Sequence, residues 1–280
     1  MVLEKLRLDG PPRKVVIVTG GGRGLGRAMA ISLAEAGADV CIASRTVSQL
    51  ESAAAEIAAA GGRQPLIVPT NVQKREECDA LIEKTVAHFG RLDVMLNNAG
   101  IGDRRGAGNR IQDLDDADWH DTIEVNLHST FYCSRAATRQ FLQQGGGGVI
   151  VNVASGTALR SSPQSLGYAA AKAGVISLTK SLAAQLVGED IRVNCIIPGF
   201  VAQSAPQNDD EVAMRKQRGR FITVRRLGEA WELGPLAVFL CSDASSYVTG
   251  ESFSIDGGGL AGGVAPTGFA MTEPAEVSRG

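Results

Sequence analysis

The chain has 280 residues, a formal net charge of −2 and a hydrophobic fraction of 44%, so it can build a full core and carries no excess of basic charge that would suit a nucleic acid. Its five cysteines have no Cys-x-x-Cys spacing and only three histidines accompany them, which argues against a metal site and against a disulfide framework. No apolar run is long enough for a membrane span or a signal peptide, so we expect a soluble, cytoplasmic protein.

Strands and helices are expected to alternate from the first strand to the last. Short apolar runs predict seven strands, at 14–19, 39–44, 65–72, 93–99, 148–154, 191–198 and 251–256. Helical periodicity is found at 25–36, 47–60, 74–89, 115–143, 165–187 and 229–241. Two segments, 101–113 and 200–227, are expected to be irregular.

This alternation is typical of a doubly wound sheet with helices on both faces. We therefore predict an α/β fold in one domain over residues 10–258, with a seven-stranded, mostly parallel sheet, followed by a tail rich in Gly, Ala and Pro at 259–280. Ligands of such sheets bind at the carboxyl ends of the strands.

A glycine-rich turn, Thr19-Gly-Gly-Gly-Arg-Gly-Leu-Gly26, separates the first strand from the first helix. Its spacing, Gly-x-x-x-Gly-x-Gly, differs from the Gly-x-Gly-x-x-Gly fingerprint. Glycines in this position let the backbone approach a pyrophosphate, whose charge the helix N-terminus favours. The turn therefore predicts a nucleotide site.

Tyr168 and Lys172 are four residues apart in an alanine-rich helical segment, so both side chains lie on one face. An ammonium group beside a phenol lowers the phenol pKa from its usual value of about 10. Such a tyrosine can exchange a proton with an alcohol or ketone. Ser155 ends the strand at 148–154 and could hold the substrate oxygen. The alternative for Tyr168 and Lys172 is a pair of surface neighbours in a good helix sequence.

Together these motifs resemble the short-chain dehydrogenase/reductase family over about residues 10–258, with similarity to 3-oxoacyl carrier-protein reductases and to sugar and alcohol dehydrogenases. The matching positions are Thr19 to Gly26, Asn97-Asn-Ala-Gly100, Asn126, Ser155, Tyr168-Ala-Ala-Ala-Lys172 and Pro198-Gly199. The resemblance implies a Rossmann fold and NAD(P)-dependent oxidoreductase activity. It makes Tyr168 the general acid/base, lets Lys172 bind the nicotinamide ribose and lower the tyrosine pKa, lets Ser155 orient the carbonyl, and gives Asn126 a place in a proton relay.

The resemblance also implies a set of cofactor-binding residues: Gly20, Gly22, Arg23, Gly24, Leu25, Gly26, Ser44, Arg45, Asn71, Val72, Asn98, Ala99, Gly100, Tyr168, Lys172, Pro198, Gly199 and Val201. NAD-dependent relatives have an acidic residue at the position of Ser44, whereas here Arg45 and Arg23 can pair with a 2′-phosphate. We therefore expect NADP rather than NAD. The chain departs from the family pattern at Asn71, where an aspartate is usual, and at Gln203, where a threonine is common.

The leading hypothesis is an NADP-dependent oxidoreductase acting on a small-molecule secondary alcohol or ketone. Alternatives are an NAD-dependent alcohol or sugar dehydrogenase of the same family, a non-catalytic dinucleotide-binding sensor, and an epimerase or dehydratase of a longer related family. We expect a homodimer or homotetramer formed through the helices at 115–143 and 165–187, and neither a nucleic-acid nor a membrane partner.

The substrate is expected to meet residues 156–159 and the loop after Pro198, which carries Phe200, Val201 and Phe221. Loop arginines are either solvated or placed to meet an anionic substrate; they are Arg104, Arg105, Arg110 and Arg160.

Overall fold

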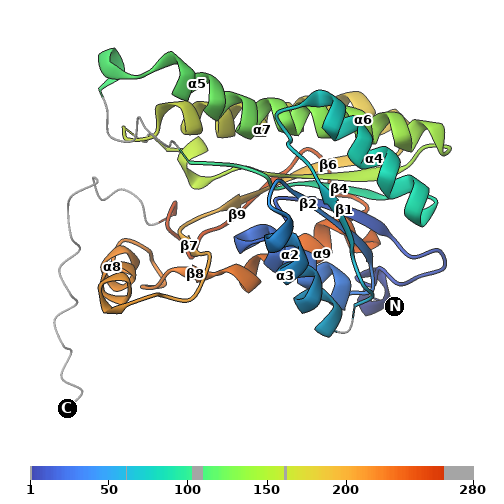
Figure 1. Cartoon of the computed structure of the whole chain (residues 1–280), viewed down its shortest axis with the longest axis horizontal. Helices are drawn as coiled ribbons and strands as arrows, with labels where there is room; N and C mark the ends of the chain where they lie inside the picture. The colour runs from blue at the N-terminus through green and yellow to red at the C-terminus, as the bar shows by residue number, and fades with distance from the viewer. Residues whose placement is uncertain (1, 61, 103–109, 161–162, 262–280) are drawn as a thin grey trace.

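A seven-stranded sheet, with strand order β3-β2-β1-β4-β5-β6-β9, forms the centre of the molecule (Figure 1). The computed structural model describes residues 2–60, 62–102, 110–160 and 163–261. Its strands are β1 (Val15–Thr19), β2 (Asp39–Ser44), β3 (Leu66–Pro69), β4 (Val94–Asn97), β5 (Gly148–Val153), β6 (Ile191–Pro198) and β9 (Ser252–Ile255). Every pairing between them is parallel. The predicted doubly wound fold is confirmed, and the chain order reverses between β1 and β4, where such sheets bind ligands.

Helices cover both faces of the sheet (Figure 1). One face carries α2 (Gly24–Glu35), α3 (Val47–Ala59) and α9 (Gly234–Cys241), and the other carries α4 (Arg75–Phe89), α5 (Asp116–Ile123), α6 (Ser129–Gln143) and α7 (Leu166–Leu186). A short helix α1 (Val2–Lys5) precedes the sheet. No helix in the described ranges is both long and apolar enough to cross a membrane.

The two helical layers produce two large core clusters, and β1 contributes to both, while a third, small cluster of the described residues includes Val175 and Cys195. Val16 and Val18 belong to the cluster with α2 and α9, while Val15 and Ile17 belong to the cluster with α4 and α6. Because a central parallel strand is buried on both faces, it reads as an unbroken apolar run in the sequence. All five cysteines are buried free thiols in these layers.

The helical stretch predicted at 115–143 is interrupted by η2 (Glu124–His128), a π-helical turn between α5 and α6. Asn126 lies in this turn, and its Nδ2 donates to the carbonyl oxygen of Thr122 at 2.9 Å. A π turn inserts an extra residue into a helix and is frequent at functional sites.

The expectation that residues 200–227 are irregular is wrong over much of this segment. It begins with β7 (Val201–Ala202), which pairs with β8 (Gly228–Glu229), and contains α8 (Asp209–Gly219). The Asn208 side chain caps α8 by accepting from the Glu211 N–H at 2.9 Å. Acidic residues in its first turn and basic residues in its last suit the helix dipole. α8 lacks an apolar face, so periodicity did not reveal it.

Other boundaries differ slightly from the expectation. The helix predicted at 229–241 starts as the 3-10 turn η5 (Ala230–Leu233), and the segment 101–113 ends in the 3-10 turn η1 (Ile111–Asp113). Residues 103–109 and most of the predicted tail, from 262 on, lie outside the described residues. The domain limits 10–258 therefore stay a prediction.

Candidate active site

A cavity of about 350 Å³ opens at the carboxyl ends of the central strands. Its walls come from the glycine turn, from the ends of β2, β4, β5 and β6, and from α7. The lining residues that the sequence predicted are Gly20, Gly22, Arg23, Leu25, Gly26, Ser44, Asn98, Ala99, Gly100, Ser155, Tyr168, Lys172, Pro198, Gly199 and Val201. The structure thus brings together segments that lie far apart in the chain.

The glycine turn leaves its backbone open toward a ligand. Gly24 has a φ of +54°, which favours glycine, and a Cβ on Gly26 would overlap the carbonyl oxygen of Gly20. Arg23 precedes α2 in an extended conformation and makes no side-chain cap. The first N–H groups of α2 therefore remain available for an anion.

Thr19 joins the ends of β1 and β4. Its Oγ1 accepts from the backbone N–H groups of Asn98 and Ala99, each at 3.1 Å, and Asn98 Nδ2 donates to the Thr19 carbonyl oxygen at 3.0 Å. Behind this joint, Asn97 Nδ2 donates to Asn152 Oδ1 at 2.9 Å. The floor of the cavity is held by hydrogen bonds between buried polar groups, which fixes its shape.

Lys172 is buried under the cavity, with 3% of its surface exposed. Its Nζ donates to the Val153 carbonyl oxygen at 2.9 Å and lies 5.7 Å from the centre of the Tyr168 ring. Burial lowers the pKa of Lys172 to about 8, and the nearby Cys195 opposes this effect only in part. The amine therefore stays largely protonated at pH 7, but it is a desolvated cation rather than the ordinary ammonium group that the sequence suggested.

Asn126 lies behind the cavity wall and reaches it through Ile101. Its Nδ2 donates to the Ile101 carbonyl oxygen at 2.8 Å, and its Oδ1 accepts from the Ile101 N–H at 3.2 Å. A Cβ on Gly100 would lie 2.8 Å from Asn126 Oδ1 and 3.4 Å from Lys172 Nζ. The two polar groups therefore face a common point beside Gly100.

Ser155 stands at the end of β5, before the 3-10 turn η3 (Gly156–Ala158). Its Oγ accepts from Thr157 N at 3.3 Å and from Thr157 Oγ1 at 3.1 Å. Since both bonds use Ser155 as the acceptor, its own hydroxyl hydrogen can be donated into the cavity.

Basic and polar groups that have no partner in the described part of the chain gather where β2 ends. Ser44 Oγ is buried and has no hydrogen-bond partner among the described residues. A Cβ on Gly22 would lie 3.2 Å from this oxygen, so the turn approaches it closely. Arg23 and Arg45 are exposed, and neither side chain forms an ion pair within the described residues, where no carboxylate lines the cavity either.

Some predicted cofactor residues do not line the cavity: Gly24, Arg45, Asn71 and Val72. Asn71 Oδ1 accepts from Gln73 N at 3.2 Å, and Val72 is buried in the core. Their cofactor contacts stay predictions. Sequence reasoning omitted five lining residues, Gln49, Ile101, Gly102, Val153 and Ala154, and it named a sixth, Gln203, only as a departure from the family pattern. Most of these residues end or follow a strand, so the predicted strand ends were the signal that could have identified them.

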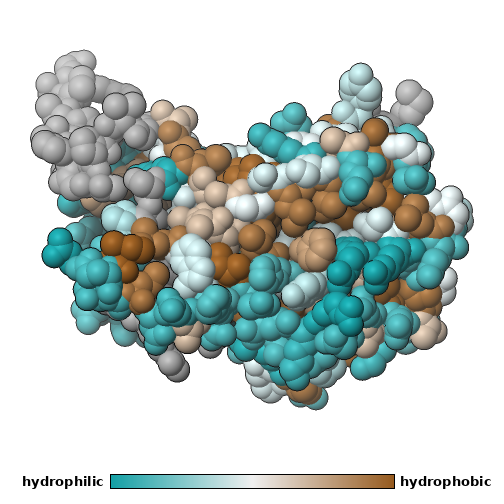
Figure 2. Space-filling model, turned by 90° about the horizontal axis from the view of Figure 1, so that it is seen from above, coloured by the Kyte–Doolittle hydropathy of each residue, from teal (hydrophilic) through white to brown (hydrophobic). Residues whose placement is uncertain are grey.

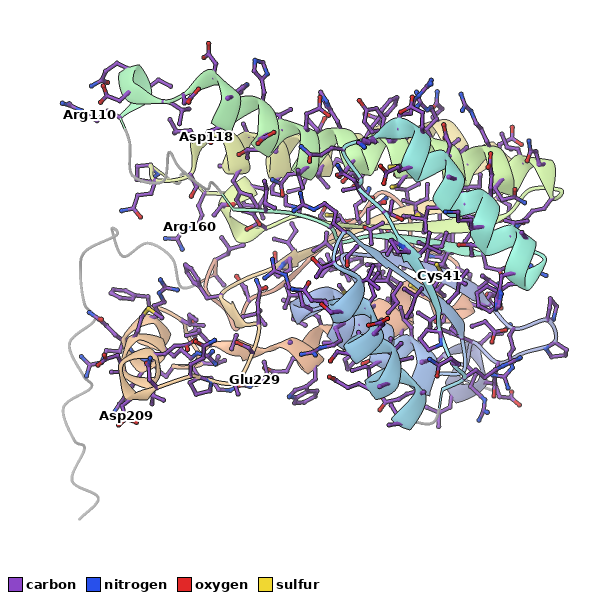
Figure 3. The ribbon with its side chains drawn as sticks, in the orientation of Figure 1. Cys41, Arg110, Asp118, Arg160, Asp209 and Glu229 are labelled. Atoms are coloured by element: carbon purple, nitrogen blue, oxygen red, sulfur yellow. The ribbon has the colours of Figure 1, made fainter. Side chains whose placement is uncertain are left out.

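The expected substrate residues are only partly in place. Val201 lines the cavity, whereas the segment 156–159 and Phe221 do not. Arg110 and Arg160 are exposed and lie at the same end of the molecule as α8 (Figure 3). Arg104 and Arg105 lie outside the described residues.

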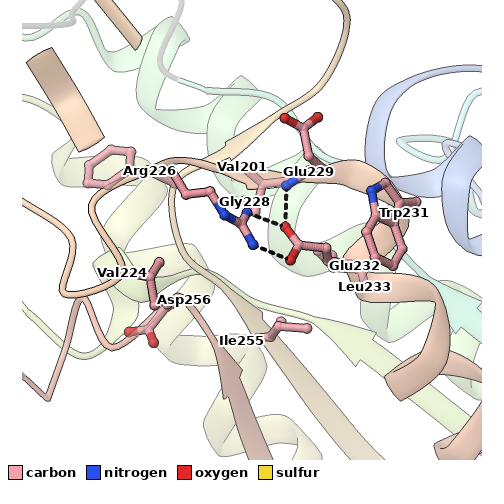
Figure 4. Close-up of a pocket in the computed structure, with 12 residues that line it drawn as sticks. Val201, Val224, Arg226, Gly228, Glu229, Trp231, Glu232, Leu233, Ile255 and Asp256 are labelled. Atoms are coloured by element: carbon pink, nitrogen blue, oxygen red, sulfur yellow. Dashed lines mark hydrogen bonds and ion pairs between the residues drawn. The ribbon is translucent and has the colours of Figure 1, made fainter. Parts of the chain in front are cut away.

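A second cavity, of about 320 Å³, lies between η5 and the end of β9 and shares Val201 with the first. Phe200 lines this cavity instead of the larger one. At its rim the Glu232 carboxylate accepts from Arg226 at 2.7 and 2.8 Å and from Glu229 N at 2.7 Å (Figure 4). These bonds hold the pKa of Glu232 down at about 2. Its only lining cation among the described residues, Arg226, is already paired with Glu232, so this cavity is the weaker candidate for chemistry.

Known proteins share both the sequence and the fold. The family described as "Enoyl-(Acyl carrier protein) reductase" matches residues 20–259. The 2-dehydro-3-deoxy-D-gluconate 5-dehydrogenase of Escherichia coli is 36% identical, over 93% of this chain and 100% of its own length. The 3-oxoacyl-[acyl-carrier-protein] reductase FabG of Staphylococcus aureus is 35% identical, over 88% of this chain and 97% of its own length. The crystal structure of an NADPH-dependent 3-quinuclidinone reductase from Rhodotorula rubra has a TM-score of 0.81 and 34% identity, and the match covers 93% of this chain and 95% of that one.

Proposed function

Since the chain belongs to the short-chain dehydrogenase/reductase family of oxidoreductases, we propose that it interconverts a secondary alcohol and a ketone with NADP as its cofactor. The family uses a nicotinamide dinucleotide, and relatives are named as a gluconate-derivative dehydrogenase and as a 3-oxoacyl reductase. The observation that carries the proposal is that Ser155, Tyr168 and Lys172 line one cavity. This cavity also borders the glycine turn, and α2, which follows the turn, has no side-chain cap at its N-terminus.

The residues around the turn and β2 fit NADP. Gly20, Gly22 and Gly26 would admit the diphosphate, while Ser44 and Arg23 would meet the 2′-phosphate. The unpartnered Ser44 hydroxyl supports this assignment, because a buried polar group normally has a partner. When bound, the cofactor supplies or accepts the hydride. One structural relative is named as NADPH-dependent, which agrees with the choice of NADP over NAD.

Proton transfer falls to Tyr168. Its phenol oxygen would give a proton to the forming alkoxide or take one from the alcohol, while the Ser155 hydroxyl holds the substrate oxygen. Lys172 keeps a positive charge near the phenol, and such a charge favours the phenolate. Asn126 positions Ile101 and Gly100 next to this group.

A homodimer or homotetramer completes the proposal. Figure 2 looks onto the face covered by α5, α6 and α7 and shows apolar residues among polar ones. Large apolar side chains exposed on these helices include Trp119, Phe131 and Leu142. An exposed apolar patch of this kind suits an interface. The cytoplasm stays our expectation for the compartment.

Tyr168→Phe tests the proposal, with Tyr132→Phe as its matched control. Both changes remove only a hydroxyl from a half-buried tyrosine, but Tyr132 does not line the cavity. Wild type and variants are screened against alcohols and ketones with NADP(H) and NAD(H), following the absorbance of the reduced nicotinamide. We expect Tyr168→Phe to lower turnover by about 10²–10⁴-fold and Tyr132→Phe to leave it unchanged. Near-wild-type turnover of Tyr168→Phe contradicts the proposal, and NADP binding without turnover by wild type supports the sensor instead.

A further inference from the structure

Thr157 occupies both acceptor positions of the Ser155 hydroxyl. Its backbone N–H donates to Ser155 Oγ at 3.3 Å, and its own hydroxyl donates to the same atom at 3.1 Å. A serine oxygen has two lone pairs and one hydrogen. Since one neighbour engages both lone pairs, the hydrogen is the part of the Ser155 hydroxyl that is left for a group in the cavity that this residue lines.

The main chain around Ser155 is held without the Thr157 hydroxyl. After Ser155, the backbone N–H of Ala158 donates to the Ser155 carbonyl oxygen at 2.9 Å and closes the turn η3. Before it, the N–H of Ala154 donates to the Ile196 carbonyl oxygen of the neighbouring strand, also at 2.9 Å. Removing the threonine hydroxyl therefore leaves the bonds that fix the place of Ser155.

The Thr157 hydroxyl also has no second partner in the described ranges of the chain. It is half-buried, it does not line the larger cavity, and its bond to Ser155 Oγ is the one that it makes there. Other threonines use this group locally: Thr85 and Thr179 each donate to the carbonyl oxygen one helical turn back, at 2.8 Å. The Thr157 hydroxyl instead acts on a side chain of the candidate active site.

We propose that Thr157 is a positioning residue that makes Ser155 a hydrogen-bond donor to the substrate oxygen and keeps it from acting as an acceptor. This inference rests on the proposed oxidoreductase function. A carbonyl or alkoxide oxygen accepts hydrogen bonds, so it matches Ser155 in this state, and the proton of an alcohol is left to Tyr168. In a chain of hydrogen bonds each bond polarises the next. Donation from Thr157 therefore strengthens the bond from Ser155 as charge grows on the substrate oxygen.

Thr157→Val tests this role, because it replaces the hydroxyl by a methyl group and keeps the backbone N–H. We measure ketone reduction on the best substrate found, with the nicotinamide cofactor that wild type prefers. We expect kcat to fall about fivefold, which corresponds to a hydrogen bond of about 1 kcal/mol. KM should change little, because the lost bond is strongest in the transition state. Thr157→Ser keeps the hydroxyl and should restore wild-type kcat.

Thr138→Val is the matched control. Thr138 is half-buried and its hydroxyl donates to a protein oxygen, the Ser134 carbonyl at 2.8 Å, but it does not line the cavity. This variant should leave both kcat and KM at the wild-type values.

A double-mutant cycle with Ser155→Ala separates the proposed role from a structural one. Once the serine hydroxyl is gone, Thr157→Val should lower kcat no further, because its effect passes through Ser155. An equal loss in both backgrounds overturns the proposal, as does wild-type kcat in Thr157→Val or a loss that Thr157→Ser fails to restore. Each of these results leaves the oxidoreductase function standing. If wild type turns over no alcohol or ketone, the proposed function itself fails, and this inference fails with it.

Discussion

Lys172→Met should reveal how much folding free energy the buried ammonium group costs. The pKa of this lysine falls from 10.5 to about 8 because burial disfavours its charge. That difference corresponds to about 3 kcal/mol against the folded state. Methionine has a similar length and no charge, so it removes this cost. It also removes the hydrogen bond to Val153, worth about 1–3 kcal/mol. At pH 7 the two changes oppose each other, and we expect similar stabilities.

The pH dependence separates the two contributions. Below about pH 8 the lysine is protonated in both folded and unfolded chains, and the full cost is present. Between about pH 8 and 10.5 the folded protein loses the proton while the unfolded chain keeps it, so the cost shrinks. The free energy of unfolding of wild type should therefore rise by about 2 kcal/mol relative to that of Lys172→Met between pH 7 and about pH 9.5.

Urea unfolding of the cofactor-free proteins, at one protein concentration and at both pH values, measures this difference. Lys180→Met, which alters an exposed lysine of α7, is the control and should follow wild type. If the stability difference between wild type and Lys172→Met stays constant over this range, the buried-charge reasoning is refuted. The variant should also lose activity, since the charge beside Tyr168 is gone.

Three further outcomes are expected. The double change Ser44→Asp with Arg45→Ala should reverse the cofactor preference toward NAD, measured as the ratio of kcat/KM values; a wild type that already prefers NADH contradicts the NADP assignment. Asn126→Ala leaves both polar groups of Ile101 without their partner and should destabilise the protein by about 1–3 kcal/mol, measured by thermal unfolding, whereas an unchanged Tm would contradict it. Sedimentation at micromolar concentration should show a dimer or tetramer, and a monomer would argue against the proposed interface.

Much of the fold could be predicted because the apolar residues of each strand indicate in the sequence that the strand is buried. The unbroken apolar run at β1 is typical of a strand covered on both faces, and the bounds predicted for β2 and β6 agree with the structure. The glycine turn and the spacing of Tyr168 and Lys172 are local features, since two residues that are three or four positions apart in a helix lie on the same face. Such short-range patterns need no knowledge of the rest of the chain.

α8 shows where local patterns end. Its stability comes from the Asn208 cap and from charges that suit the helix dipole, so no apolar stripe marks it. In the π turn, the Asn126 side chain likewise bonds Ile101, twenty-five positions away in the chain. Periodicity reports that a face is buried, but not which partner covers it.

The layered fold, the glycine turn and the residue types that chemistry of this kind requires can all be predicted from local patterns. The burial and hydrogen bonding of those residues follow from how the strands and helices pack. This packing buries Lys172 against the Val153 carbonyl, leaves Ser44 Oγ without a partner, and brings Gln203 against Gly24. The reason is physical: desolvation and hydrogen bonding act through space, and the distances that control them are set by how strand ends from distant parts of the chain meet.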